Sequence, residues 1–143
     1  ILLCEPSVSS VSLKQEWKAC NERSNPIYFS DALSFDYKKY LIQNNLPMHI
    51  NYFSCDIDPA ENTFIALKCV IESGISFDFI SYEHDDYVNK ESYHQIACDY
   101  LIPKGYKIAI DNVFPRNKKK KIFETWFVNK DIDFKKVEFI EWK

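Results

Sequence analysis

Apolar runs of strand length alternate with helix-forming segments along this chain, and this alternation restricts the possible folds more than any other feature. The runs fall at residues 1–4, 27–29, 50–55 and 77–82. Strands that are separated by helices usually pair in parallel through β-α-β crossovers. Two further strands, expected at 106–114 and 123–128, are joined by a polar loop and predict an antiparallel hairpin. The sequence therefore predicts an α/β fold: a doubly wound, Rossmann-like, mostly parallel sheet that ends in a C-terminal antiparallel hairpin.

Capping residues and glycines mark the expected helix boundaries. Asp58 is a candidate N-cap for the helix after the third strand, and Glu61 completes a capping box three residues later. Gly74 follows the last apolar position of that helix and supplies its stop. The segment 93–101 carries apolar residues at helical spacing, and Gly105 ends that unit. We therefore expect each of these helices to pack one apolar face on the sheet.

Length and composition indicate one globular domain without nucleic-acid or membrane partners. The chain has 143 residues, which fits a single domain over 1–143, with 46% hydrophobic and 27% charged residues. The formal net charge of −3 gives no basic field that would attract nucleic acid. No apolar run reaches the roughly 18 residues that a membrane-spanning helix needs.

The cysteines indicate a reducing compartment. There are five, an odd number, and none forms a C-x-x-C pair. Each lies among apolar residues of an expected strand or helix, where a free thiol behaves as a small hydrophobic side chain. We therefore expect a cytoplasmic protein with free thiols, and the spacings do not favour a zinc site.

The glycine content and the first residues suggest that the domain is partial. The chain holds only two glycines, so a G-x-G-x-x-G nucleotide-binding loop cannot be present. Ile1 to Cys4 already form an expected strand, without an initiator methionine before it. We therefore expect that an upstream strand and a glycine loop belong to the same domain.

Acidic residues follow all four expected parallel strands. Glu5, Asp31 and Asp56 come directly after the first three, and Glu83-His84-Asp85 follows the fourth. Ligands of open α/β sheets bind at the carboxyl ends of the strands, which lie on the same edge. A rim of carboxylates at this edge suits hydroxyl groups, an amino group or a cation.

Six segments in order resemble FkbM-type methyltransferases that use S-adenosylmethionine (SAM). The segments are ILLCEPS (1–7), SDAL (30–33), NYFSCDID (51–58), FISYEHD (79–85), KGY (104–106) and FETWFV (123–128). They extend over almost the whole chain, and the ordered set is more specific than any single piece. The resemblance implies a SAM-dependent methyl transfer, commonly to an oxygen atom of a small-molecule or sugar hydroxyl.

The resemblance also implies cofactor-binding residues. Glu5 matches the acid that binds the two ribose hydroxyls of SAM, and Asp31 with Ala32 matches the segment near adenine. Asp56 matches the acid beside the methyl donor. The family's D-x-E-G segment is replaced by Asp56-Ile57-Asp58-Pro59. The family's glycine loop holds the amino-acid end of SAM, so we expect the 143-residue chain alone to bind SAM weakly.

Two hypotheses compete for the chemistry at the strand ends. His84 could take the proton of the acceptor hydroxyl as general base, oriented by Asp85 or Asp56, with neighbouring acids raising its pKa. Alternatively, Asp56, Glu83 and Asp85 could hold a Mg²⁺ ion. We favour the base, because imidazole is a poor ligand for Mg²⁺ and a good proton acceptor near neutral pH.

Other interpretations of the same residues stay open. Asp56-Ile57-Asp58 also resembles the D-x-D of metal-dependent nucleotide-sugar glycosyltransferases. A third possibility is a non-catalytic domain that keeps the methyltransferase-like fold. Asp31 could simply cap a turn, and the run Lys118–Lys121 fits a solvated hairpin loop.

Overall fold

The computed structural model describes residues 2–4, 28–113 and 121–133. The elements in order are β1 (Leu2–Cys4), β2 (Tyr28–Ser30), α2 (Tyr37–Gln43), β3 (His49–Cys55), α3 (Ala60–Glu72), β4 (Ser76–Glu83), α4 (Tyr93–Leu101), a 3₁₀ turn (Ile102–Lys104), β5 (Tyr106–Val113) and β6 (Glu124–Asn129). The six strands and the helices α3 and α4 each lie within a few residues of a segment that the sequence pattern predicts, so the alternation of strands and helices is confirmed here.

The main sheet has four strands in the order β3-β4-β6-β5. β3 and β4 are parallel, and β6 runs antiparallel to both of its neighbours, β4 and β5. The expected parallel pair at residues 50–55 and 77–82 and the expected antiparallel hairpin are therefore confirmed. The hairpin forms one edge of the sheet, with its second strand, β6, next to β4 and its first strand, β5, outermost.

The prediction that all four early strands share one sheet is wrong for the described residues. β1 and β2 pair in parallel with each other and form a separate two-stranded sheet. Sequence patterns identify strands, but pairing between distant strands depends on how the layers pack, and local patterns do not carry that information.

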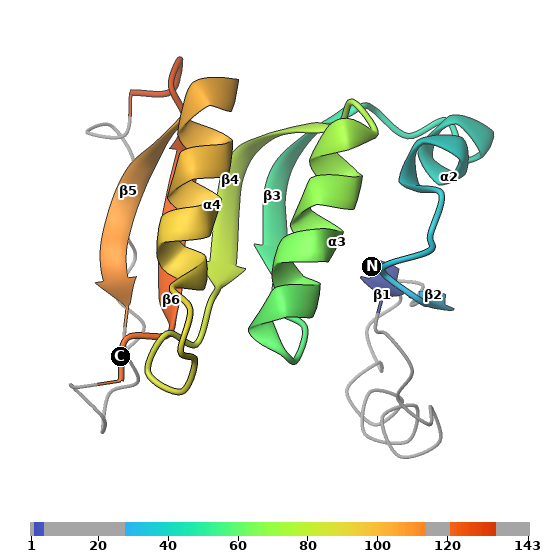
Figure 1. The fold of residues 1–143 in the computed structure, drawn as a ribbon. Helices are drawn as coiled ribbons and strands as arrows, with labels where there is room; N and C mark the ends of the chain where they lie inside the picture. Colours follow the sequence, from blue (N-terminus) through green and yellow to red (C-terminus); the bar gives the residue numbers. More distant parts are fainter. Residues whose placement is uncertain (1, 5–27, 114–120, 134–143) are drawn as a thin grey trace, which may run out of the picture.

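Figure 1 shows α3 and α4 side by side in front of the same face of the main sheet. The connections from β3 to β4 and from β4 to β5 both advance in the same direction across the sheet. Right-handed crossovers that advance in one direction put their helices on one face, which accounts for this layer. The described helices over the main sheet therefore form one layer, and the structure shows an open mixed α/β sheet.

The core lies between this helix layer and the sheet. Leu67 of α3 and Leu101 of α4 are fully buried, and they belong to the same apolar cluster as Ile80, Tyr82 and Phe127 of the sheet. Complete burial of such a side chain contributes about 1.5–3 kcal/mol to folding. The apolar residues at i, i+3 and i+4 in both helices thus pack on the sheet, as the sequence predicts.

The glycine stops are confirmed, whereas the expected cap of α3 is wrong. Gly74 and Gly105 adopt φ values of +83° and +94°, a region in which a residue with a Cβ atom is strained. Helix α3 begins at Ala60, and Pro59, not Asp58, stands at its N-cap position without a side-chain cap bond. The Thr63 hydroxyl instead binds the backbone N–H and carbonyl of Ile57, fastening the loop before the helix.

No helix among the described residues is long and apolar enough to cross a membrane.

Candidate functional site

The carboxyl ends of β3 and β4 bring acidic side chains together at one edge of the main sheet. Cys55 and Tyr82 are partners in the parallel register, so the next residues, Asp56 after β3 and Glu83 at the end of β4, lie side by side at this edge. Asp56 is exposed and Glu83 is half-buried. The predicted convergence of these two carboxylates is therefore confirmed.

The pKa of Glu83 reflects the short distances between these acidic side chains. Burial, as the largest cause, together with a hydrogen bond with Asp56 and the charges of Asp56, Asp85 and Glu124, raises the pKa of Glu83 to about 8. A carboxyl group with such a pKa exists in both protonation states near neutral pH, and it can both donate and accept a proton.

Asp85 belongs to the same group. Its pKa is raised by partial burial first and then by the charges of Asp58 and Asp56, while hydrogen bonds with Glu83 and Tyr87 act in the opposite direction. Asp85 adopts a φ value of 48°, in the left-handed region, directly before the turn at residues 86–88 that follows β4. The acid edge is defined here as Asp56, Asp58, Glu83, Asp85 and Glu124.

Glu124 joins this edge from the antiparallel strand. It is the register partner of Glu83, and its pKa is raised by burial and then by the charge of Asp56. The indole Nε1 of Trp126 donates a hydrogen bond to a Glu124 carboxylate oxygen, which acts to lower that pKa. Sequence reasoning missed Glu124, since only the insertion of β6 beside β4 places it there.

His84 does not lie with the acid edge, and its predicted role as an accessible base is wrong in this structure. Successive residues of a strand point to opposite faces, so the side chain after Glu83 turns toward the helix layer. His84 is 1% exposed. Burial is the largest influence on its pKa and lowers it, against the opposing effect of Asp86, so the expected increase is also wrong. Strict two-residue alternation along β4 would have assigned His84 to the interior.

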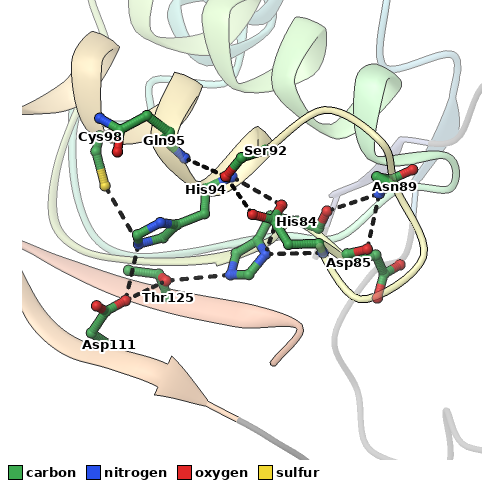
Figure 2. A network of polar contacts seen from close by, with 10 residues as sticks. His84, Asp85, Asn89, Ser92, His94, Gln95, Cys98, Asp111 and Thr125 are labelled. Carbon is green, nitrogen blue, oxygen red and sulfur yellow. Dashed lines mark hydrogen bonds and ion pairs between the residues drawn. The ribbon is translucent and has the colours of Figure 1, made fainter. Parts of the chain in front are cut away.

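Figure 2 shows a polar network that holds His84 in place. The backbone N–H of Asp86 donates to His84 Nδ1 at 3.3 Å, and His84 Nε2 lies 3.4 Å from the Thr125 hydroxyl. Thr125 in turn donates to Asp111 Oδ1 at 3.1 Å, and the same oxygen lies 3.0 Å from His94 Nε2. These contacts connect the end of β4 with β6, β5 and α4. The network therefore stabilises the buried position of His84.

The residues that were expected near adenine occupy a tight turn. Asp31 is exposed, and its carboxylate accepts hydrogen bonds from Leu33 N at 2.9 Å and Ser34 Oγ at 3.0 Å. Ala32 is buried, and its carbonyl accepts a hydrogen bond from the Tyr37 hydroxyl at 2.8 Å. This turn follows β2, which pairs with β1 and not with the main sheet. Glu5 lies outside the described residues.

The remaining candidate groups are a metal site, the lysine run and the cysteines. Within residues 2–4, 28–113 and 121–133, no group of three His, Cys, Asp or Glu side chains is arranged to hold a metal ion. Of the lysine run, only Lys121 is described, and its Nζ lies 4.9 Å from the ring centre of Tyr87. Cys55 and Cys98 are buried free thiols, and burial raises the pKa of Cys98 to about 11.

Comparison with known proteins gives no further guide to this edge. No protein-family model matches the chain, and neither a curated protein nor a solved structure matches it.

Proposed function

We propose that this chain is part of a SAM-dependent methyltransferase that transfers a methyl group to a hydroxyl of a small molecule or carbohydrate. One observation carries the proposal: Asp56 and Glu83 follow two adjacent parallel strands and share a hydrogen bond, and the pKa of Glu83 is raised to about 8. The carboxyl edge of parallel strands is where ligands of open α/β sheets bind.

Glu83 takes the role of general base in this proposal, in place of His84. A base is most effective when its pKa lies near the working pH, and burial together with Asp56 brings Glu83 into that range. The deprotonated Glu83 carboxylate accepts the proton of the acceptor hydroxyl as the oxygen bonds to the methyl carbon. Asp56 orients Glu83 through their hydrogen bond, and Asp85 lies beside both.

The fold supports this assignment in part. A parallel pair joined by a helix and a C-terminal antiparallel hairpin are what the FkbM resemblance implies for this portion of the chain. The doubly wound Rossmann-like arrangement and the roles of Glu5, Asp31 and Ala32 toward SAM remain part of the proposal. A cytoplasmic location also belongs to it, supported by the free thiols of Cys55 and Cys98.

The test is calorimetric binding of SAM by the chain in its natural sequence context, including any residues before Ile1. We expect SAM to bind, and Glu83→Gln to leave SAM affinity nearly unchanged while lowering methyl transfer by about 100-fold, the lower range for a lost general base. Glu91→Gln is the matched control, because Glu91 is an exposed glutamate in the loop before α4. Equal turnover by both variants would refute the base assignment.

The same titrations distinguish the other functions. Binding of a nucleotide sugar with a divalent metal, without binding of SAM, would identify a glycosyltransferase that uses Asp56 and Asp58. Binding of neither ligand would identify a non-catalytic domain. Turnover that chelator abolishes and Mg²⁺ restores would show that the acid edge works through a metal ion.

A further inference from the structure

The starts of β3 and β4 carry a serine, a histidine and an aspartate in hydrogen-bonded sequence, away from the acid edge. His49 opens β3, and its register partner Ser76 opens β4. The Ser76 hydroxyl lies 2.9 Å from His49 Nδ1, and Asp78 Oδ1 lies 2.9 Å from His49 Nε2. Figure 1 shows that these strand starts lie at the opposite end of the sheet from the acid edge.

The hydrogen-bond directions fit one tautomer of His49. A carboxylate only accepts hydrogen bonds, so the proton between Asp78 and His49 resides on Nε2. Nδ1 then carries the lone pair and accepts the hydrogen bond from the Ser76 hydroxyl. An imidazole placed between a carboxylate and a hydroxyl in this way is the arrangement that activates a nucleophilic serine.

The carboxylate is itself held in place. Asn51 Nδ2 donates to Asp78 Oδ2 at 2.7 Å, so both oxygens of Asp78 are engaged, one by His49 and one by Asn51. All four side chains come from alternating positions of two adjacent strands, and strands fix side-chain directions more firmly than loops do. The His49 side chain is 51% exposed, so the group is open to a ligand from solvent.

We propose that Ser76 is an activated nucleophile that accepts an acyl group from activated carboxylic esters, with His49 as its base and Asp78 as the group that orients His49. Ser76 Oγ attacks the carbonyl carbon while its proton passes to His49 Nδ1. The bond between that carbon and the leaving oxygen, which belongs to a good leaving group such as a phenolate, breaks, and the new bond to Oγ leaves an acylated Ser76. His49 returns the proton to the departing oxygen or to water.

The surroundings of Ser76 define which acyl donors fit. Its own N–H donates to the Met48 carbonyl at 3.0 Å, and the N–H of Phe77 donates to the Tyr106 hydroxyl at 3.1 Å. These two amides are therefore not available to stabilise an oxyanion, a contribution that is worth about 100- to 1,000-fold in rate. The site therefore suits donors with a good leaving group, and amides and simple alkyl esters are excluded as substrates.

The test exposes the protein to p-nitrophenyl acetate, with release of nitrophenolate followed by absorbance and the acylated residue located by peptide mass spectrometry. We expect one stable acetyl group on Ser76. Ser76→Ala should abolish it, and His49→Gln should slow its formation by about 100-fold. Ser54→Ala is the matched control, because Ser54 is an exposed serine of β3, and it should acylate at the rate of the unaltered protein.

Locating the acetylated residue in the unaltered protein gives a decisive result even if a variant fails to fold. Acetylation that occurs on lysine or tyrosine but not on Ser76 would overturn the proposal, as would a rate that His49→Gln does not change. SAM binding plays no part in this experiment, so its outcome is independent of the proposed methyl transfer at the acid edge.

Discussion

Because the pKa of Glu83 is raised in the folded protein, we predict that this side chain makes the free energy of unfolding depend on pH. The substitution Glu83→Gln keeps the shape and the hydrogen-bonding capacity of the side chain but removes its charge. In the folded protein the pKa of Glu83 is about 8, against an ordinary value of 4.5. Above the ordinary value the unfolded chain gives up this proton, whereas the folded protein still holds it, so ionisation favours unfolding.

The sign and the pH window follow from that difference. The protonated Glu83 side chain makes its full contribution to the free energy of unfolding below pH 4.5. This contribution is lost as the pH rises through about 8. A difference of 3.5 pH units corresponds to an upper limit of about 5 kcal/mol at 1.36 kcal/mol per unit. Glu83 is only half-buried and water screens its neighbours, so we expect about 1–2 kcal/mol.

The assay is urea denaturation of both proteins at pH 4, 6 and 8. We expect Glu83→Gln to leave the free energy of unfolding unchanged at pH 4 and to raise it by about 1–2 kcal/mol at pH 8, without a change in the m-value. Glu91→Gln, at an exposed position, should show no such pH dependence. A Glu83→Gln protein that is less stable at pH 8, or equally shifted at both ends of the range, would refute the crowding of acids at this edge.

Three further predictions concern the core and the turns. His84 has a lowered pKa, so acidification from pH 7 to 5 should reduce the free energy of unfolding, and denaturation of His84→Gln should show a weaker dependence over this range. Gly105→Ala should cost about 1 kcal/mol or more, seen as a lower midpoint in thermal unfolding, because φ is +94° there. Leu67→Ala should cost about 2–5 kcal/mol in urea denaturation, since Leu67 is fully buried, whereas a loss below 1 kcal/mol would contradict its packing.

The candidate site was predictable only in part. Asp56 and Glu83 follow apolar runs that read as neighbouring parallel strands, and their position at one edge follows from that pattern. His84 was misplaced because the acids on either side of it in the sequence suggested a polar loop, whereas the strand continues to Glu83 and turns the next side chain inward. The environment of a side chain depends on which face of a strand it occupies, and composition does not report that.

The Ser76, His49 and Asp78 group illustrates the same limit. Ser76 and His49 lie 27 positions apart, and nothing in either local sequence points to the other. The register between β3 and β4 brings them within hydrogen-bond distance. Register is set by the apolar residues that both strands bury against the helices, and the pairing of the polar residues along the same strands follows from it.

Local sequence patterns were sufficient to locate the helices and strands of the described region and their ends. Helical spacing of apolar residues, strand-length apolar runs and the glycines at 74 and 105 act over a few residues, within the reach of local propensity. The tertiary structure alone decided that β6 enters between β4 and β5, that β1 and β2 pair apart from the main sheet, and that His84 is buried. These features depend on contacts between distant segments, whose free energies are settled only when the layers pack together.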